Sequence, residues 1–281
     1  MHNRVLKQIM VIIVALLLLS SCTSGPRSVQ PVKGLPEASG DYGWWSSSVF
    51  YEIFVRSFYD SDGDGIGDLN GVIQKLDYLN DGDPKTTSDL GVTGLWLMPI
   101  MPSPSYHGYD VTDYYSVNPD YGTNEDFKRL MDEAHQRGIR VVIDLVLNHT
   151  SDQHPWFQQS RSSLDNPYRD WYLWRKGRAD GRAPNNWQSV FGGKAWQYDA
   201  ATGEYYYHMF CREQPDVNWR SPAVRAAMLE VFRFWLERGV DGFRLDVFNV
   251  YFKDDQLRDN PPALGLRGFD RQRHVYDCDR P

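Results

Sequence analysis

The stretch "RVVIDLVLNH", Arg140–His149, decides the fold because it is a run of apolar, mostly β-branched residues interrupted by one acidic residue. Three further runs share this character: "VFYEIFV" (Val49–Val55), "GLWLMPI" (Gly94–Ile100) and "GFRLDVFN" (Gly242–Asn249). Short apolar or aromatic runs of this kind are typical of strands buried on both faces of a parallel sheet. The sequence therefore predicts four such strands.

Helical patterns separate these runs. After a cap at Thr123 or Asn124 and before Gly138, apolar residues recur at i, i+3, i+4 and i+7: Phe127, Leu130, Met131 and Ala134. A second helix is predicted to open at Ser221-Pro222 and to end before Gly239, with this apolar stripe: Val224, Met228, Val231, Phe232 and Trp235. A weaker pattern predicts a third helix over Leu69–Leu79. Strands that alternate with helices predict an α/β fold.

Residues 150–215 break this alternation, because they show no sustained period and many turn residues. We expect them to form an irregular insertion after the third strand, which we call domain B. A closed TIM-type (β/α)8 barrel needs eight strand–helix units and typically about 250 residues. The chain supplies about four units, so we expect the N-terminal half of such a barrel: a first part over residues 41–149, domain B over 150–215, and a continuation over 216–281 that stops before a fifth strand.

The first forty residues predict export. Basic residues precede the apolar run "IMVIIVALLLL", and "SSCTSG" follows it, which is the order of a secretory signal peptide over residues 1–21. Eleven apolar residues span about 16 Å as a helix, roughly half of the hydrocarbon core, so a membrane-spanning helix is disfavoured. "LSSC" (Leu19–Cys22) resembles a bacterial lipobox, which predicts a membrane-anchored lipoprotein carrying lipid on Cys22, in the periplasm or at the cell surface. Ordinary signal cleavage is the alternative. Residues 22–40, rich in Ser, Pro and Gly, predict a flexible tether.

The composition indicates which classes of molecule the chain binds. The chain has a formal net charge of −7, and the predicted signal peptide holds basic but no acidic residues, so nucleic acid is disfavoured as a partner. Ten Trp, seventeen Tyr and thirteen Phe offer flat rings that suit the apolar faces of sugars, although most such rings belong to the core. Export permits a disulfide between Cys211 and Cys278, and the sequence leaves that pairing undecided.

Candidate catalytic residues lie in the strand runs and just after them. Arg244 and Asp246 are two positions apart in "GFRLDVFN", so their side chains share one face of a strand. A carboxylate beside a guanidinium stays ionised and can act as a nucleophile; a structural ion pair is the alternative. His149 ends the third strand, where barrel enzymes build their active sites, or it is a core histidine. Tyr109 and Asp110, after a proline-rich approach, would bind a sugar or merely cap a loop.

The loop "SFYDSDGDGIGDLNG", residues 57–71, gathers four aspartates with little apolar content. The carboxylates at alternate positions, together with the carbonyl of Ile66, form a set that suits Ca²⁺: Asp60, Asp62, Asp64 and Asp68. Gly71 stands where an EF-hand would supply its bidentate Glu, which disfavours an EF-hand sensor. A metal-free turn is the remaining alternative.

Four ordered motifs carry a family resemblance: "HGYDVTDYYSVNPDYGT", "DLVLNHTSDQHPWF", "EQPDVNW" and "GFRLDVFN". Together they resemble glycoside hydrolase family 13, the α-amylase family, over about residues 44–281. The resemblance implies a TIM-type barrel with domain B after the third strand, Asp246 as catalytic nucleophile with Arg244 as its companion, and Tyr109, Asp110 and His149 as the residues that hold the sugar at the cleaved bond. The aspartate loop is similar to the structural calcium loop of the family's α-glucosidases.

The resemblance also implies a substrate class. "QPDVN" (Gln214–Asn218) and Val247 resemble the oligo-1,6-glucosidase branch, so we expect a retaining hydrolase of α-1,4 or α-1,6 bonds in short α-glucans. A retaining mechanism needs a second carboxyl group about 5 to 5.5 Å from the nucleophile. The family places it on a Glu after a fifth strand, and no Glu here matches that motif, which puts the activity of these 281 residues alone in question. Two alternatives stay open: a trehalose- or sucrose-type isomerase or transglycosylase, and a non-catalytic sugar-binding lipoprotein remnant.

Overall fold

The computed structural model describes residues 43–46, 48–266 and 268–279, and the chain divides into two compact units, residues 1–46 and 47–281. The predicted signal peptide over 1–21, the tether over 22–40 and the lipidation of Cys22 lie outside the described residues. In the first unit the described residues include one short 3-10 helix, η1 (Trp44–Ser46). All the other elements belong to the second unit.

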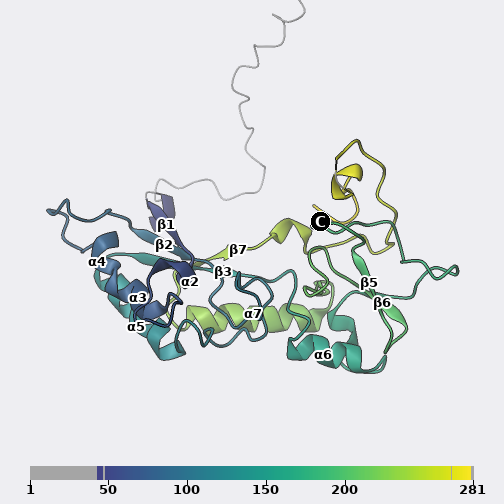
Figure 1. Ribbon diagram of the computed structural model, residues 1–281, viewed down its shortest axis with the longest axis horizontal. Coiled ribbons are helices and arrows are strands. Elements are labelled where there is room, and N and C mark those ends of the chain that lie inside the picture. The colour runs from purple at the N-terminus through teal and green to yellow at the C-terminus, as the bar shows by residue number, and fades with distance from the viewer. Residues whose placement is uncertain (1–42, 47, 267, 280–281) are drawn as a thin grey trace, which may run out of the picture. The chain divides into compact units, whose positions relative to one another are not determined.

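The second unit contains a four-stranded parallel sheet (Figure 1). Its strands follow one another in the order β1 (Phe50–Ile53), β2 (Gly94–Leu97), β3 (Arg140–Leu145) and β7 (Gly242–Leu245). Each predicted run forms one of them, and each strand ends earlier than its run because the last residues enter a loop or the first turn of a short helix. Four parallel strands with helical crossovers confirm the predicted half of a (β/α)8 barrel.

Three predicted helical regions are present. The helices between the sheet strands are α2 (Val55–Phe58), α3 (Leu69–Gln74), α4 (Leu76–Leu79), α5 (Asn124–Gln136) and α7 (Pro222–Leu236). Thr123 caps α5 through a reciprocal capping box with Asp126. The helix predicted over Leu69–Leu79 is instead two short helices, because Lys75 leaves the helical region with ψ at 6°. Both pieces still bury their apolar residues.

The core lies between the sheet and its helices. In Figure 1, α3, α5 and α7 lie on the same side of the strands. The predicted apolar stripes face inward, since the following residues are fully or nearly fully buried: Phe127, Leu130, Met131, Ala134, Val224, Met228, Val231 and Trp235. Phe232 is partly buried and packs against Phe243 of β7, with ring centroids 4.9 Å apart. Burial of each large apolar side chain contributes about 1.5 to 3 kcal/mol.

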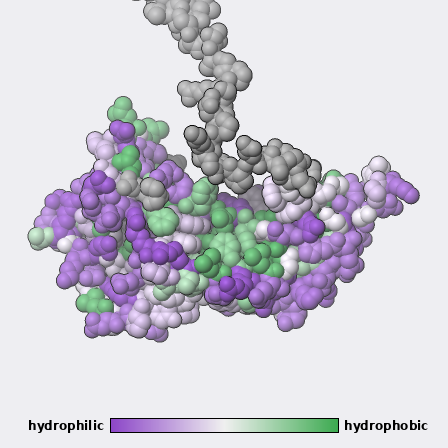
Figure 2. All heavy atoms as spheres, turned by 180° about the vertical axis from the view of Figure 1, so that it is seen from behind, coloured by the Kyte–Doolittle hydropathy of each residue, from purple (hydrophilic) through white to green (hydrophobic). Residues whose placement is uncertain are grey.

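The edge strands are less covered than the central ones. β2 and β3 are mostly buried, whereas Phe50 of β1 is 42% exposed and Leu245 of β7 is 37% exposed. Figure 2 shows a continuous hydrophobic patch near the centre of the face seen from behind, on a surface that is otherwise mainly hydrophilic. Within the described residues, none of the helices is long and apolar enough to cross a membrane.

Domain B contains more regular structure than its sequence indicates. It holds α6 (Pro155–Ser162), η2 (Arg169–Trp171) and an antiparallel sheet in the order β4 (Trp174–Arg175), β6 (Glu204–Tyr207), β5 (Trp196–Asp199). These strands are only two to four residues long, too short to show alternation. A second core of aromatic residues packs here, with Trp187 and Trp196 each about 5.2 to 5.3 Å from the ring of Tyr207.

The chain after β7 packs on this second core. It contains two short 3-10 helices, η3 (Phe248–Val250) and η4 (Phe269–Arg271). Trp187 donates its indole N–H to the carbonyl of Arg258 at 2.9 Å, and Val250 belongs to the same apolar cluster. Cys211 and Cys278 are both free thiols, so the disulfide that the sequence left undecided is not formed between these two described residues.

Candidate active site

The register of the parallel sheet brings three charged residues together at its carboxyl end. Asp144 of β3 pairs directly with Arg244 of β7, and Asp246 follows two residues after Arg244. Nη1 of Arg244 lies 3.1 Å from each carboxylate oxygen of Asp144 and 2.5 Å from Oδ1 of Asp246. One guanidinium therefore bridges two carboxylates, and it fixes the orientation of Asp246.

Asp144 is the buried member of this group, with 0% exposure. The hydroxyl of Tyr109 donates to its Oδ2 at 3.1 Å. Burial raises the pKa of Asp144 to about 6, although the charge of Arg244 opposes that rise. Burial, and then the nearby charge of Asp144, raise the pKa of Tyr109 above its usual range, so the phenol remains a hydrogen-bond donor.

Asp246 directly follows β7, at a sharp change of backbone direction. Its N–H donates to the carbonyl of Leu145 at 3.2 Å, and Tyr251 donates to its carbonyl at 3.3 Å. The next residue, Val247, has φ at 40°, in the left-handed region. A β-branched side chain is rarely found there, and such strained residues cluster at functional sites. Asp246 and Val247 both line a cavity.

This cavity has a volume of about 250 Å³ and receives residues from the barrel and from domain B. Its lining includes three of the predicted site residues: Tyr109, His149 and Asp246. Domain B adds four residues that the sequence analysis did not single out for the site: Phe191, Phe210, Cys211 and Gln214. The rings of Phe191 and Phe210 are 5.9 Å apart. No periodicity or charge pattern marks these two among thirteen phenylalanines.

His149 connects the cavity wall to domain B. Its Nε2 lies 2.9 Å from the carbonyl oxygen of Tyr109 and 3.0 Å from Nε2 of Gln214, and its Nδ1 lies 3.2 Å from Nδ2 of Asn148. Burial lowers the pKa of His149, so the imidazole is neutral near pH 7. A neutral ring that donates on one side and accepts on the other holds Tyr109 and Asn148 in place.

Asp110 directly follows Tyr109, and its Oδ1 lies 3.9 Å from Nδ1 of His107, which lines the cavity. Its carboxylate accepts hydrogen bonds from the hydroxyls of Ser103 at 2.5 Å and Ser105 at 2.8 Å. It is 3% exposed and is not among the residues that line the cavity. The structure thus brings Tyr109, His149 and Asp246 together at the cavity, with Arg244 holding Asp246, and places Asp110 in a loop fixed by two serines.

A buried ammonium supports the same wall, and the sequence analysis missed it. Nζ of Lys253 lies 2.5 Å from Oδ2 of Asp216 and 2.9 Å from Oδ1 of Asn148. Asp216, which is 0% exposed, also accepts from Nδ2 of Asn148 and from the backbone of Met209, each at 2.8 Å. This network, which we call the lysine cluster, ties the end of β3 to domain B and to the chain after β7. In the sequence Lys253 stands beside two aspartates and resembles a surface residue.

The aspartate loop after β1 is a separate candidate cation site. Carboxylate oxygens of Asp60, Asp62 and Asp68 lie within 4.8 Å of one another. Asp60 accepts from the backbone of Gly63 at 2.7 Å and of Gly65 at 2.8 Å, and these hydrogen bonds lower its pKa. In the same loop Asp64 accepts from the N–H of Ile66, and Asp68 accepts from the N–H groups of Ser61 and Gly71. Three of the four predicted carboxylates therefore lie close together, whereas the carboxylate of Asp64 accepts a hydrogen bond within a turn.

The chain is similar to known proteins in both sequence and structure. A family model described as the alpha amylase catalytic domain matches residues 52–280. An oligo-1,6-glucosidase of Parageobacillus thermoglucosidasius is 53% identical over 238 residues, which cover 84% of this chain and 41% of that protein. The crystal structure of the alpha-glucosyl transfer enzyme XgtA has a TM-score of 0.79 at 46% identity, covering 85% of this chain and 45% of that one.

A third comparison is with the trehalulose synthase MutB from Pseudomonas mesoacidophila. Its crystal structure has a TM-score of 0.74 at 50% identity and covers 79% of this chain and 38% of that one. The chain thus spans about two fifths of the length of the relatives it matches. The similarity includes the strands, domain B and the segment after β7, because the matched residues run from 52 to 280.

Proposed function

Because the chain belongs to the alpha-amylase family, we propose that Asp246 is the nucleophile of a retaining α-glucosidase that acts on short α-glucans. The observation that carries the proposal is the position of Asp246: it directly follows a barrel strand, lines a cavity, and is held by Arg244. Barrel enzymes build their catalytic sites at this end of the sheet. The relatives named glucosidases support this reaction class.

In the proposed reaction, an oxygen of Asp246 attacks the anomeric carbon of a glucosyl unit and the bond to the leaving oxygen breaks. Arg244 orients the carboxylate before the attack. Phe191 and Phe210 supply apolar surface against which a sugar ring packs. Water then attacks the glycosyl ester, so two inversions give net retention.

The leaving oxygen needs a proton from a second carboxyl group. Among the described residues, Asp144 shares Arg244 with Asp246, but it is fully buried and does not line the cavity. We therefore assign Asp144 as a group that positions Arg244 rather than as the proton donor. Efficient turnover of an ordinary glucoside then requires a carboxyl group additional to those that the described residues place at the cavity.

The relatives favour a short substrate, because several of them are named oligo-1,6-glucosidases. We therefore propose short α-1,4- or α-1,6-linked oligosaccharides, derived from starch or isomalto-oligosaccharides, as substrates.

A second candidate is an isomerase or transglycosylase that uses the same nucleophile. The fold similarity to MutB and to XgtA favours it, since those proteins are described as a trehalulose synthase and an alpha-glucosyl transfer enzyme. The two candidates differ in what accepts the glucosyl group from Asp246. Products from maltose and sucrose distinguish them: free glucose supports the hydrolase, and a rearranged disaccharide supports the isomerase.

A fluoride leaving group tests the nucleophile without the proton donor. Incubation of the chain with an activated, fluorine-substituted α-glucosyl fluoride should break the bond between C1 and fluorine, release fluoride, and join C1 to a carboxylate oxygen of Asp246. Intact-mass and peptide mass spectrometry should show one added fluorine-substituted glucosyl unit on the peptide that contains Asp246. Asp246→Asn should remove this adduct, and Asp132→Asn, at an exposed surface position, should keep it. Absence of any adduct on the folded wild-type chain would reject Asp246 as nucleophile.

We also propose a structural Ca²⁺ ion in the aspartate loop. The converging carboxylates of Asp60, Asp62 and Asp68 fit a hard cation that prefers oxygen ligands. The ion would hold the loop between β1 and α3 and would take no part in the reaction. We further propose export with lipid attachment at Cys22, supported by the order of basic, apolar and small residues in residues 1–22.

A further inference from the structure

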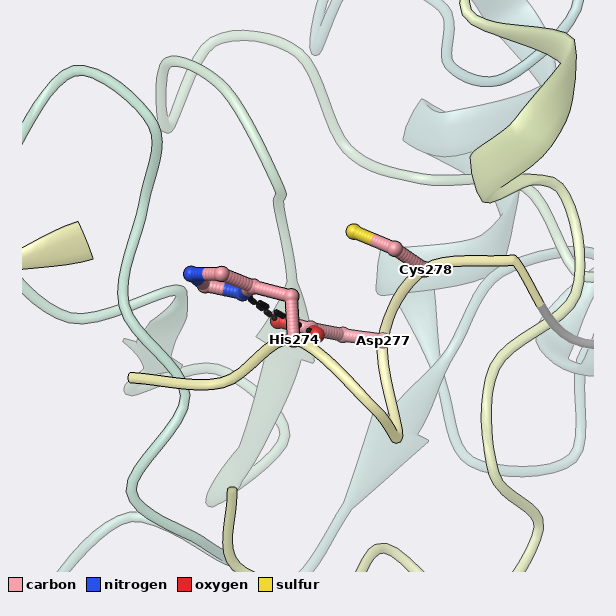
Figure 3. A group of neighbouring side chains, drawn as sticks. All are labelled: His274, Asp277 and Cys278. Carbon is pink, nitrogen blue, oxygen red and sulfur yellow. Dashed lines mark hydrogen bonds and ion pairs between the residues drawn. The ribbon is translucent and has the colours of Figure 1, made fainter. Parts of the chain in front are cut away.

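A cluster of three different donor types lies in the segment after β7. His274, Asp277 and Cys278 place a ring nitrogen, a carboxylate oxygen and a thiol sulfur within 4.8 Å of one another (Figure 3). Asp277 is fully buried, and the side chain of His274 is 17% exposed. None of the three lines the cavity of the candidate active site. The cluster is thus separate from the proposed catalytic residues.

The hydrogen bonds of His274 define which nitrogen faces the cluster. Nε2 lies 2.8 Å from the carbonyl oxygen of Phe269, so this nitrogen carries a hydrogen and donates it. The imidazole also stacks on the ring of Phe269, with centroids 3.6 Å apart. Both contacts lock the ring, and they direct Nδ1 toward Asp277.

Nδ1 of His274 lies 2.9 Å and 3.1 Å from the two carboxylate oxygens of Asp277. With the hydrogen of a neutral ring on Nε2, Nδ1 presents a lone pair to two oxygens that also carry lone pairs. Such an approach requires a positive charge between them, which is either a proton or a metal ion. Figure 3 shows the sulfur of Cys278 on the side where the imidazole and the carboxylate meet.

We propose that Nδ1 of His274, the carboxylate of Asp277 and the sulfur of Cys278 bind one zinc-like divalent cation. A mixed nitrogen, oxygen and sulfur set suits Zn²⁺, whereas the all-oxygen aspartate loop suits Ca²⁺. The hydrogen bond from Nε2 to Phe269 is the outer contact that metal-bound histidines usually make. Binding releases to solvent both the thiol proton of Cys278 and the proton that lies between Nδ1 of His274 and Asp277 in the metal-free chain, and water completes a tetrahedral shell.

The proposed ion has a structural role. His274 is held at η4 through Phe269, while Asp277 and Cys278 belong to the turn that follows. The same turn is joined to the rest of the segment by the N–H of Asp254, which donates to the carbonyl of Tyr276 at 2.8 Å. A metal bridging the two places would fix this turn beside η4, and it would hold Cys278 in the position where that residue packs on the second core.

Cobalt provides the direct test, because Co²⁺ bound to a thiolate gives a charge-transfer band in the near ultraviolet. Co²⁺ added to the metal-free chain should produce this band at one equivalent, and Zn²⁺ should bleach it by displacement. Cys278→Ser should abolish the band, and Cys211→Ser, which keeps the same number of thiols, should retain it. Asp277→Asn should weaken Co²⁺ binding about tenfold or more.

A second measurement uses the unmodified sequence, so it does not depend on whether a variant folds. Alkylation of the native chain, followed by peptide mass mapping, should show Cys278 protected by Zn²⁺ and Cys211 equally reactive with and without it. If no Co²⁺ band forms and Zn²⁺ leaves the alkylation of Cys278 unchanged, the charge between His274 and Asp277 is a proton and the proposal is wrong.

Discussion

Two regions of the molecule collect carboxylates, and they neutralise them differently. At the carboxyl ends of β3 and β7, Asp144, Asp216 and Asp246 are buried and contact the cationic side chains of Arg244 or Lys253. In the aspartate loop Asp62 and Asp64 are exposed, Asp60 is half-buried and Asp68 is buried, and their partners are backbone N–H groups and the hydroxyl of Ser61 rather than cationic side chains. In the first region the neutralising cations are side chains of the protein itself.

The difference follows from burial. A buried carboxylate needs a fixed opposite charge, because moving an ion out of water costs several kcal/mol. An exposed carboxylate needs none, so backbone amides are sufficient to order the loop. The loop therefore keeps a surplus of negative charge, which a metal ion can neutralise, whereas the interior site has its balance built from Arg244 and Lys253.

Removal of the buried ammonium of Lys253 should change the stability of the protein most. Lys253→Met leaves the buried carboxylate of Asp216 without its ammonium partner, so the free energy of unfolding should fall by about 3 to 5 kcal/mol. Lys253→Met combined with Asp216→Asn should recover part of that loss, because no unpaired charge then remains. Urea denaturation of the chain measures all three proteins.

The matched control is the surface pair of Lys128 and Asp132, whose side chains are 68% and 56% exposed. Lys128→Met should cost no more than about 1 kcal/mol, as exposed ion pairs do. Equal losses for Lys253→Met and Lys128→Met would mean that the lysine cluster is not a required counter-charge.

Calcium should give the next largest effect, and it addresses the aspartate loop alone. Ca²⁺ at about 100 times its dissociation constant adds about 2.7 kcal/mol of stability, which should raise the melting temperature by roughly 5 to 10 °C. A chelator should reverse the shift, and Asp60→Asn should remove it. The formation of the glucosyl adduct on Asp246 should not change.

Asp83→Asn is the control for the loop. Asp83 accepts from the N–H of Lys85 in another acidic loop, so it has the same turn chemistry without belonging to the converging group. This variant should keep the full response to calcium. An identical melting temperature in calcium and in excess chelator would show that amide hydrogen bonds alone hold the aspartate loop.

The sequence predicted the sheet and its helices because their signals are local. A dozen consecutive residues are enough to recognise a buried strand such as Arg140–Leu145, or a capped apolar stripe such as that of α5. The shared face of Arg244 and Asp246 follows from strand geometry in the same way. The pairing of Asp144 with Arg244 depends on the register between two strands a hundred residues apart, which no local pattern records.

The rest of the site depends on contacts between distant segments. Phe191 and Phe210 reach the cavity only because domain B folds over the ends of the strands. Lys253 becomes buried only when Asp216 and Asn148 surround it. None of these residues is marked by a pattern in its own stretch of sequence, and the partners that bury Lys253 lie 37 and 105 positions away.

Substitution of Asp144 should change stability least, and it tests how far Arg244 compensates the buried charge of the interior site. Its pKa of about 6 in the folded chain lies above the value of about 3.9 for an unfolded aspartate. A raised pKa means that the stabilising contribution of this group is complete below about pH 4 and is lost as the pH rises through about 6. Asp144→Asn cannot ionise and should not show this loss.

The difference in unfolding free energy between Asp144→Asn and the wild-type chain should therefore shift in favour of the variant by about 2 kcal/mol from pH 4 to pH 7. Taking the difference matters because burial lowers the pKa of His149, His154 and His208, and those groups make both proteins less stable as the pH falls below about 6.5. Asp132→Asn, at an exposed position, should give a difference that does not change with pH. A flat difference for Asp144→Asn as well would mean that Arg244 fully compensates both carboxylates, and that burial leaves no surplus charge at the interior site.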